Sequence, residues 1–283
     1  FLRVCGISLI LPNALFRARA AEKSAPHPLS SFDVEMERFM ESRKTPGGAL
    51  AVVKGRRLVY ARGYGWADRE QQLPAKPDSL FRIASLSKPF TAVAVLKLVE
   101  EKRLKLDDRA FDVIQFEPVP EPDSKPDARL QKVTIRQLLQ HTGGWDRDKS
   151  FDPMFRPKRI AEAVGSPPPA NARAIIRYML GQRLDFDPGT RYAYSNFGYC
   201  MLGRIIEKIT GQSYQEHVQK AILAPIGIKR MRLGATPTGG QVEGEVRYYT
   251  PDNATAQSVF PDTTAPVPWP YGGFYLEAMD AHG

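Results

Sequence analysis

The sequence predicts an α+β fold, in which a helix and a β-hairpin come before a long, mainly helical region. Apolar residues recur at helical spacing over residues 31–42, which indicates an amphipathic helix. Two apolar runs, residues 48–53 and 58–64, flank Lys54-Gly55-Arg56 and are typical of a hairpin. From residue 83 onward helical patterns dominate as far as residue 235. One layer of strands with helices and one helical region are therefore expected.

The helical region is built from five predicted helical segments. These are residues 81–101, 134–140, 172–180, 197–210 and 213–223. The first is apolar on nearly all sides, which predicts a buried helix. Gly211 is expected to end the fourth, because glycine is favoured just after a helix. Residues 117–128 are rich in Pro and acidic residues and are expected to form a surface loop.

Composition indicates an ordinary globular protein. The chain has 283 residues, of which 42% are apolar and 25% charged, so it is long enough to bury a core. The formal net charge is +9. Three arginines lie among the first twenty residues, which contain no acidic residue, so the rest of the chain carries +6. No basic run is interleaved with aromatic residues, and nucleic acid is therefore not an expected partner.

Cysteines and histidines are too few and too scattered for a metal site. The two cysteines, Cys5 and Cys200, exclude a disulfide framework, and Cys200 is expected in the core. The four histidines, at positions 27, 141, 217 and 282, lack metal-ligand spacing. We expect neither a metal nor any other cofactor.

Residues 1–20 are expected to be an export leader. An apolar centre from Val4 to Leu15 precedes Ala18-Arg19-Ala20, a small-x-small cleavage signal. The opening Phe-Leu-Arg resembles the end of a twin-arginine export motif, which predicts a periplasmic or extracellular protein. The alternative is an amphipathic N-terminal helix. Because Pro12-Asn13 interrupts the short segment, no stable membrane span is expected.

The first candidate for chemistry is the pair Ser85 and Lys88. Side chains three positions apart on a helix lie on one face, so the hydroxyl and the amine can share a proton. A desolvated lysine can activate a serine as a nucleophile. The alternative is that Ser85 caps a helix and Lys88 reaches solvent, because Ser-x-x-Lys is a loose pattern.

The second candidate is Tyr194-Ser195-Asn196, which precedes a predicted helix. A tyrosine near cations can pass a proton, and an asparagine two positions later can bond both Lys88 and a substrate carbonyl or amide. The alternative is a buried tyrosine and a helix-capping asparagine. The two patterns support each other, since they occur at two predicted helix starts in one chain.

Three segments together resemble one protein family. FRIASLSKPFTA, VTIRQLLQHTGGW and PGTRYAYSNFGY are similar to segments of the penicillin-binding-protein-like serine hydrolases, which include class C β-lactamases, D-Ala-D-Ala carboxypeptidases and β-lactamase-like esterases. The resemblance covers roughly residues 31–283. It implies a β-lactamase-like α+β fold with an antiparallel sheet flanked by helices, beside a mainly helical region.

The resemblance also implies roles for single residues. Ser85 would be the acylated nucleophile, Lys88 its activating partner, Tyr194 the proton shuttle, and Asn196 a contact for substrate and lysine. In the HTGG segment, His141 and Gly143 are expected to be structural. Trp145 is expected either to form a wall of the substrate pocket or to pack in the core, and both interpretations stay open.

One family motif has no counterpart in the sequence. No Lys-Thr-Gly or His-x-Gly variant fits the third motif, and residues 271–273 and 281–283 resemble only the stretch before the family's last strands. We therefore expect a leader, residues 1–20, and one incomplete domain, residues 21–283, with the C-terminal strands missing. Within it, residues 31–82 and 236–283 would form the α/β layer and residues 83–235 the helical region. Such a chain is expected to be weakly active or inactive and prone to aggregate.

The predicted function is that of a serine hydrolase that acts through an acyl-enzyme on an ester, amide or β-lactam bond. Esterase or carboxypeptidase activity is favoured over a dedicated β-lactamase, and the partner would be a small-molecule or peptide substrate. The nucleophile motif of ordinary esterases, Gly-x-Ser-x-Gly, is absent. The alternative is a non-catalytic module on the same scaffold that binds a ligand of the cell envelope. The sequence does not predict an oligomeric state.

Overall fold

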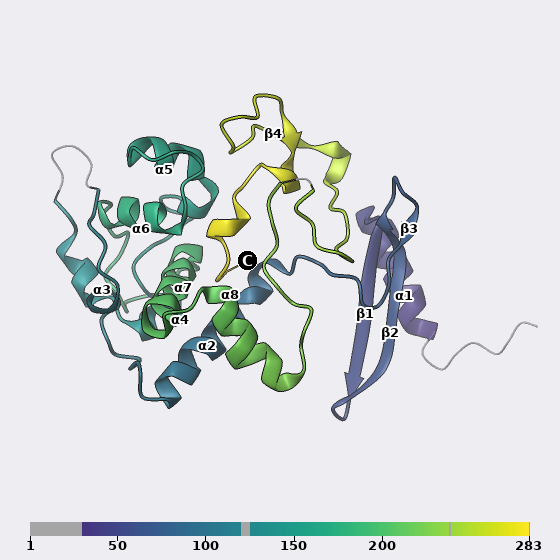
Figure 1. Cartoon of the computed structure of the whole chain (residues 1–283), viewed down its shortest axis with the longest axis horizontal. Helices are drawn as coiled ribbons and strands as arrows, with labels where there is room; N and C mark the ends of the chain where they lie inside the picture. Colours follow the sequence, from purple (N-terminus) through teal and green to yellow (C-terminus); the bar gives the residue numbers. More distant parts are fainter. Residues whose placement is uncertain (1–29, 120–124, 238, 283) are drawn as a thin grey trace, which may run out of the picture.

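The computed structural model describes residues 30–119, 125–237 and 239–282. The expected leader, the centre of the expected loop 117–128, and Gly283 lie outside the described residues. At one end of the molecule, a small sheet packs with one helix, and at the other end lies a helical region (Figure 1). Extended segments join the two parts (Figure 1). This is the predicted α+β architecture, with a layer of strands beside a mainly helical region.

The sheet is a three-stranded antiparallel sheet in the order β1-β2-β3. Its strands are β1 (Gly47–Lys54), β2 (Arg57–Asp68) and β3 (Leu73–Pro74), and the preceding helix is α1 (Ser30–Arg43). The predicted hairpin is confirmed, with Lys54 paired to Arg57 and Gly47 to Gly65, and with an irregular register between Val52 and Val53.

The carboxylate of Asp33 links helix α1 to strand β2. Asp33 on α1 accepts hydrogen bonds from the hydroxyls of Tyr60 and Tyr64 on β2, the latter at 2.7 Å, and pairs with Arg62 at 2.8 Å. These three β2 residues alternate along the strand, so they share the face that α1 covers. The side chains of Val53 and Val59 are 64% and 43% exposed.

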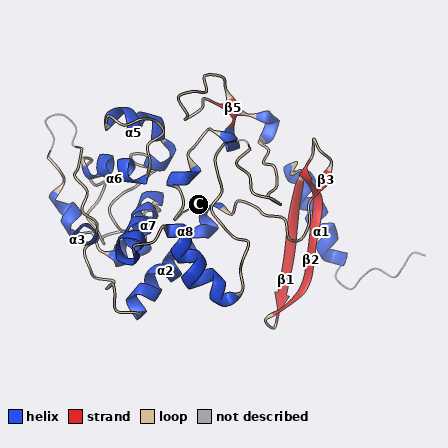
Figure 2. Ribbon diagram, viewed as in Figure 1, coloured by secondary structure: helices blue, strands red, loops and turns tan. Residues whose placement is uncertain are grey.

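The helical region is organised around α7, whose residues from Asn196 to Gly203 are all buried. Its helices (Figure 2) are α2 (Lys88–Glu100), α3 (Ala110–Val113), α4 (Ile135–Leu139), α5 (Pro157–Ala163), α6 (Ala172–Leu180), α7 (Asn196–Thr210) and α8 (Tyr214–His217). The last continues as a π-helical turn, η4 (Val218–Leu223). Gly211 ends α7 in the left-handed conformation, with φ of 70°, as the sequence predicts. Cys200 on α7 is fully buried, also as expected.

Short 3₁₀ turns connect these helices. They are η1 (Ala84–Ser87), η2 (Ala128–Lys132), η3 (Pro153–Phe155), η5 (Ala224–Ile226), η6 (Pro251–Asn253), η7 (Trp269–Tyr271) and η8 (Leu276–Ala278).

The expectation that α2 is buried on nearly all sides is wrong. Thr91, Ala94 and Leu98 are fully buried, but Val93 and Leu96 are 49% and 48% exposed. The buried side faces α7 and η4, and the side that carries Val93 and Leu96 is partly open to solvent. An apolar sequence therefore did not reveal that one side of the helix is open.

Residues 239–282 contain little regular structure. Strands β4 (Thr255–Ala256) and β5 (Val267–Pro268) pair with each other in a separate two-stranded sheet. Before them, residues 244–247 run beside the first part of the chain, where Val246 N donates to Leu80 O at 3.0 Å and Arg247 N to Ala67 O at 2.8 Å.

The last described residues return to the start of α2. Ala281 is fully buried, and its carbonyl oxygen accepts a hydrogen bond from Thr91 Oγ1 at 2.6 Å. Figure 1 shows this end of the chain between α2, α8 and the extended segments. Among the described residues, no helix has the length and apolarity needed to cross a membrane.

Candidate active site

Ser85 lies on the 3₁₀ turn η1, directly before α2. The turn begins at Ala84, whose φ of 46° is unusual for a residue with a Cβ atom. Helix α2 starts at Lys88, so serine and lysine lie on two consecutive helical turns rather than on one α-helix. Their side chains meet as the spacing predicts, because Lys88 Nζ lies 3.1 Å from Ser85 Oγ. Ser85 is exposed and accessible to a substrate.

Lys88 is buried and fully hydrogen-bonded. Its side chain is 5% exposed, and Nζ donates to Asn196 Oδ1 at 2.8 Å and to the His282 carbonyl oxygen at 2.9 Å, in addition to Ser85. Burial lowers the pKa of Lys88, while its contact with Tyr194 and the charge of Asp152 act in the opposite direction. The structure excludes the alternative in which this lysine reaches solvent.

Tyr194 and Asn196 reach the same pair from the start of α7. The Tyr194 hydroxyl lies 2.7 Å from Ser85 Oγ, and the Tyr194 ring centre lies 4.8 Å from Lys88 Nζ. Ser195, not Asn196, caps α7, because its hydroxyl oxygen accepts from Gly198 N at 3.1 Å. Asn196 is therefore the first residue of the helix, and its side chain is free to bond Lys88.

His141 contacts residues 194 and 195, which precede α7, and Tyr199 within that helix. Its Nδ1 accepts a hydrogen bond from Ser195 N at 3.1 Å, and its ring stacks on those of Tyr194 and Tyr199, with centroids 4.6 and 5.1 Å apart. Burial, together with the charge of Lys88, lowers the pKa of His141 to about 4. His141 is therefore neutral near pH 7, with an acceptor at Nδ1.

Gly143 lies where a side chain would collide with Trp145. A Cβ atom at Gly143 would be 2.8 Å from Trp145 Cζ3. Trp145 itself is 5% exposed and packs edge-on against Phe197, with ring centroids 4.8 Å apart. Trp145 thus packs in the hydrophobic core, and it also lines a second cavity of about 260 Å³, so its role in a substrate pocket stays a prediction.

Sequence reasoning missed three groups that the structure brings to the site. Asp152 Oδ2 accepts from Asn196 Nδ2 at 2.7 Å, Arg147 Cζ lies 4.8 Å from the Tyr194 ring centre, and the His282 carbonyl binds Lys88. Asp152 and Arg147 belong to an irregular segment after α4, which has no periodic pattern. No sequence signal identified either of them as part of a site.

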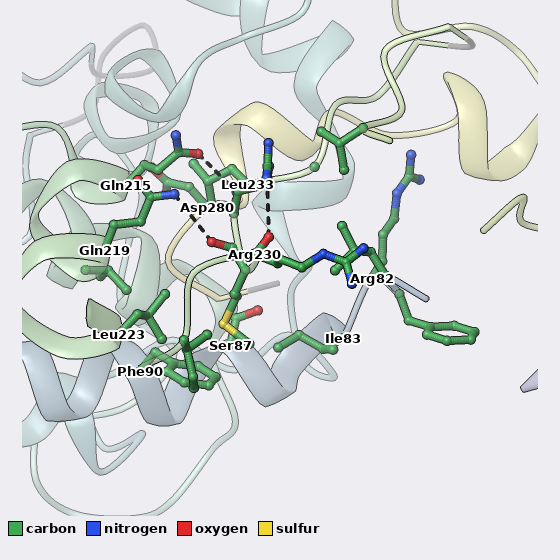
Figure 3. Close-up of a pocket in the computed structure, with 18 of the residues that line it drawn as sticks. Arg82, Ile83, Ser87, Phe90, Gln215, Gln219, Leu223, Arg230, Leu233 and Asp280 are labelled. Atoms are coloured by element: carbon green, nitrogen blue, oxygen red, sulfur yellow. Dashed lines mark hydrogen bonds between the residues drawn. The ribbon is translucent and has the colours of Figure 1, made fainter. Parts of the chain in front are cut away.

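A cavity of about 720 Å³ lies beside η1, the turn that carries Ser85 (Figure 3). It is lined by Ala84 and Ser87 from η1, Phe90 from α2, and residues of α8, η4 and the segment 227–234. Neither Ser85 nor Lys88 nor Tyr194 lines it. We therefore place the candidate active site at Ser85, Lys88 and Tyr194, outside this cavity, because these residues carry the groups that can exchange a proton. Among the described residues, no group of three or more metal-ligating side chains could hold an ion.

Comparisons with known proteins identify the family of the chain. The family model described as Beta-lactamase matches residues 32–280. A curated relative, the probable fimbrial assembly protein FimD, serogroup H1, of Dichelobacter nodosus, is 34% identical over 194 residues, which cover 68% of this chain and 44% of that protein. The chain thus spans less than half the length of this relative.

Two solved structures share the fold. One is the octameric penicillin-binding protein homologue from Pyrococcus abyssi, with a TM-score of 0.62 and 28% identity over 87% of this chain and 52% of that one. The other is the D-amino acid amidase from Ochrobactrum anthropi SV3, with a TM-score of 0.60 and 25% identity over 87% of this chain and 62% of that one. The family match extends from α1 to Asp280 and so covers more than half of the chain, and on this basis the chain belongs to the beta-lactamase family.

Proposed function

We propose that this protein is a serine hydrolase that acts through an acyl-enzyme. The observation that carries the proposal is the position of Ser85 Oγ, which lies 3.1 Å from Lys88 Nζ and 2.7 Å from the Tyr194 hydroxyl. A serine needs a neighbouring base to become a nucleophile, and here two groups can exchange a proton with it. The lowered pKa of the buried Lys88 favours its neutral form, which is the form that accepts a proton.

In the acylation step, Ser85 Oγ attacks the substrate carbonyl carbon while its proton passes to Lys88 Nζ, directly or through the Tyr194 hydroxyl. A C–O bond forms, and the carbonyl becomes a tetrahedral oxyanion. When the bond to the leaving group breaks, the same proton passes through Tyr194 to the leaving alcohol or amine. Water then attacks the acyl-enzyme, gives a proton to the same pair and releases the acid, and the proton returns to Ser85.

For the substrate, we propose an ester or amide rather than a β-lactam. The similarity to a D-amino acid amidase supports an amide, and the exposure of Ser85 is compatible with a small molecule or a peptide. The leader-like pattern of residues 1–20 supports a place of action outside the cytoplasm.

The test is intact-mass spectrometry of the product of the full-length gene after treatment with a fluorophosphonate and, separately, with a penicillin. We expect a fluorophosphonate adduct on Ser85, because Oγ displaces fluoride from phosphorus. Ser85→Ala should abolish the adduct. Ser87→Ala, a serine on the same turn that lines the cavity in Figure 3, should keep it.

The lifetime of the penicillin adduct distinguishes a peptidase-like enzyme from a β-lactamase. A long-lived adduct indicates a peptidase-like enzyme and a rapidly hydrolysed one a β-lactamase. No adduct from either reagent on folded protein would refute the hydrolase proposal and favour a non-catalytic, ligand-binding module.

A further inference from the structure

The loop after α4 contributes a negative and a positive charge to the surroundings of Lys88. Asp152 reaches the lysine through Asn196: its Oδ2 accepts from Asn196 Nδ2 at 2.7 Å, while Asn196 Oδ1 accepts from Lys88 Nζ at 2.8 Å. An amide can turn by 180° and exchange its oxygen and nitrogen. Because a carboxylate only accepts hydrogen bonds, Asp152 fixes the Asn196 amide with its oxygen toward Lys88.

An ammonium group gains more than a neutral amine from that orientation. The ammonium form has three donors, which match Asn196 Oδ1, the His282 carbonyl and Ser85 Oγ. The charge of Asp152 acts in the same direction, since opposite charges favour the charged form. Asp152 therefore favours protonated Lys88 both by charge and by the orientation of Asn196.

Arg147 has the opposite effect. Its guanidinium carbon lies 4.8 Å from the centre of the Tyr194 ring, at the same distance from that centre as Lys88 Nζ. Among the described residues it makes no side-chain hydrogen bond, and its ion-pair contact with the exposed Asp148 is 3.8 Å long. A cation so weakly neutralised disfavours a second positive charge nearby. Burial and Arg147 together lower the pKa of Lys88.

Of the other titratable groups that face Lys88, Tyr194 raises the pKa of Lys88, as Asp152 does, and the remaining ones carry no charge near pH 7. Tyr194 and Tyr199 present their rings to Nζ, at 4.8 and 5.6 Å. Burial holds the pKa of His141 at about 4 and that of His282 at about 3, so both are uncharged. Asp152 and Arg147 are the charged residues that act on Lys88 in this part of the structure.

We propose that Asp152 and Arg147 are positioning residues with opposite effects, which together set the protonation state of Lys88 and thereby the pH at which Ser85 becomes a nucleophile. This inference rests on the proposed function and adds a control over the same site. Neither residue needs to touch the substrate. Asp152 acts through Asn196, and Arg147 acts through its charge beside Tyr194.

A purely structural role for each residue is the competing explanation. Asp152 Oδ1 also accepts from Met154 N at 3.1 Å and so caps η3, and Arg147 could be an ordinary surface residue. Loss of a cap or of a surface contact changes stability, and it lowers activity at every pH alike. It does not move the pH at which activity begins.

The test measures the rate of fluorophosphonate labelling of Ser85 between pH 5 and pH 10. The rate should rise with pH as Lys88 loses its proton, and the midpoint of that rise is the readout. Asp152→Asn removes the charge, so the midpoint should move to lower pH by about one unit. Arg147→Gln removes the repelling cation and should move the midpoint to higher pH, by less than the Asp152→Asn shift, because Arg147 is exposed and solvent screens its charge. Arg147→Lys keeps the charge and should leave the midpoint nearly unchanged.

Matched controls carry the same charge changes on α5. Glu162→Gln and Lys158→Gln alter exposed residues that make no contact with the site, and their midpoints should not move. Shifts in the same direction for Asp152→Asn and Arg147→Gln, or control shifts of equal size, would overturn the inference. Because Arg147 is exposed, its variant should fold, and its midpoint decides the case if Asp152→Asn does not fold. Failure of the unsubstituted protein to label at any pH would refute the proposed function instead.

Discussion

The hydroxyl of Tyr194 lies 2.7 Å from the Oγ of Ser85, although the two residues are 109 positions apart in the chain. Local features on both sides create this contact. Ser195 caps α7 and so aims the preceding residue at η1, and His141 supports the Tyr194 ring from a third segment. The two sequence patterns that predicted chemistry therefore belong to one site, and each of its side chains can be tested separately.

Replacement of Lys88 should show whether it acts as the base. Arginine keeps a positive charge and hydrogen-bond donors, but its guanidinium does not lose its proton near neutral pH and so cannot accept one. We expect Lys88→Arg and Lys88→Met to lower the rate of fluorophosphonate labelling by roughly 10²–10⁴-fold, the usual contribution of a general base. Near-normal labelling of a folded Lys88→Arg protein would show that another group removes the proton.

Lys88→Met should also destabilise the fold. It leaves Asn196 Oδ1 and the His282 carbonyl without their donor, and each unsatisfied buried acceptor costs about 1–3 kcal/mol. Urea unfolding of the two Lys88 variants beside the unsubstituted protein separates this loss of stability from the loss of labelling.

Tyr194→Phe should affect turnover more than substrate binding. The substitution keeps the ring that stacks on His141 and removes the hydroxyl beside Ser85 Oγ. With a chromogenic ester, kcat should fall by about 10²-fold while KM changes little, because proton transfer and not binding is impaired. A change confined to KM would argue that Tyr194 only contacts the substrate.

The sequence was sufficient to predict most helices, because their signals are local. The spacing of apolar residues over 172–180 matches α6, and Gly211 ends α7 where it was expected. The exposure of Val93 and Leu96 on α2 was not predictable, because burial depends on which distant segments pack against each face. The pairing of β4 with β5 was missed for a related reason: two-residue strands carry no periodicity.

The candidate site was predictable where a short motif encodes it. Ser85 with Lys88, and Tyr194 with Asn196, are close in sequence within each pair, and the structure brings the pairs together. Asp152 and the His282 carbonyl act through tertiary contacts alone. A backbone oxygen in particular has no sequence signature, because every residue carries one.

Trp145 should prove to be a core residue in energetic terms. Truncation of a large buried aromatic side chain typically costs about 3–5 kcal/mol, so Trp145→Ala should lower the free energy of unfolding by that order. Trp145→Phe keeps an aromatic ring against Phe197 and removes an indole N–H that has no protein partner among the described residues, so it should cost less. Denaturant titration measures both changes. If Trp145→Ala left the free energy of unfolding unchanged and raised KM, Trp145 would instead be a wall of the substrate pocket.

His141 should make the stability of the protein depend on pH in the acidic range. The folded state holds the pKa of His141 at about 4, whereas an unfolded histidine titrates near 6.5. Between these values the unfolded chain binds a proton that the folded protein does not, so stability falls as the pH is lowered from about 6.5 to about 4, by up to ~1.4 kcal/mol per pH unit. His282, with a pKa of about 3, adds a similar dependence that extends to lower pH. In His141→Asn the amide oxygen can accept from Ser195 N in place of Nδ1 but cannot titrate, so its free energy of unfolding should fall less steeply over this range. An equal pH dependence for both proteins, measured by urea unfolding from pH 7 to pH 4, would mean that His141 is charged in the folded state or already accessible to protons.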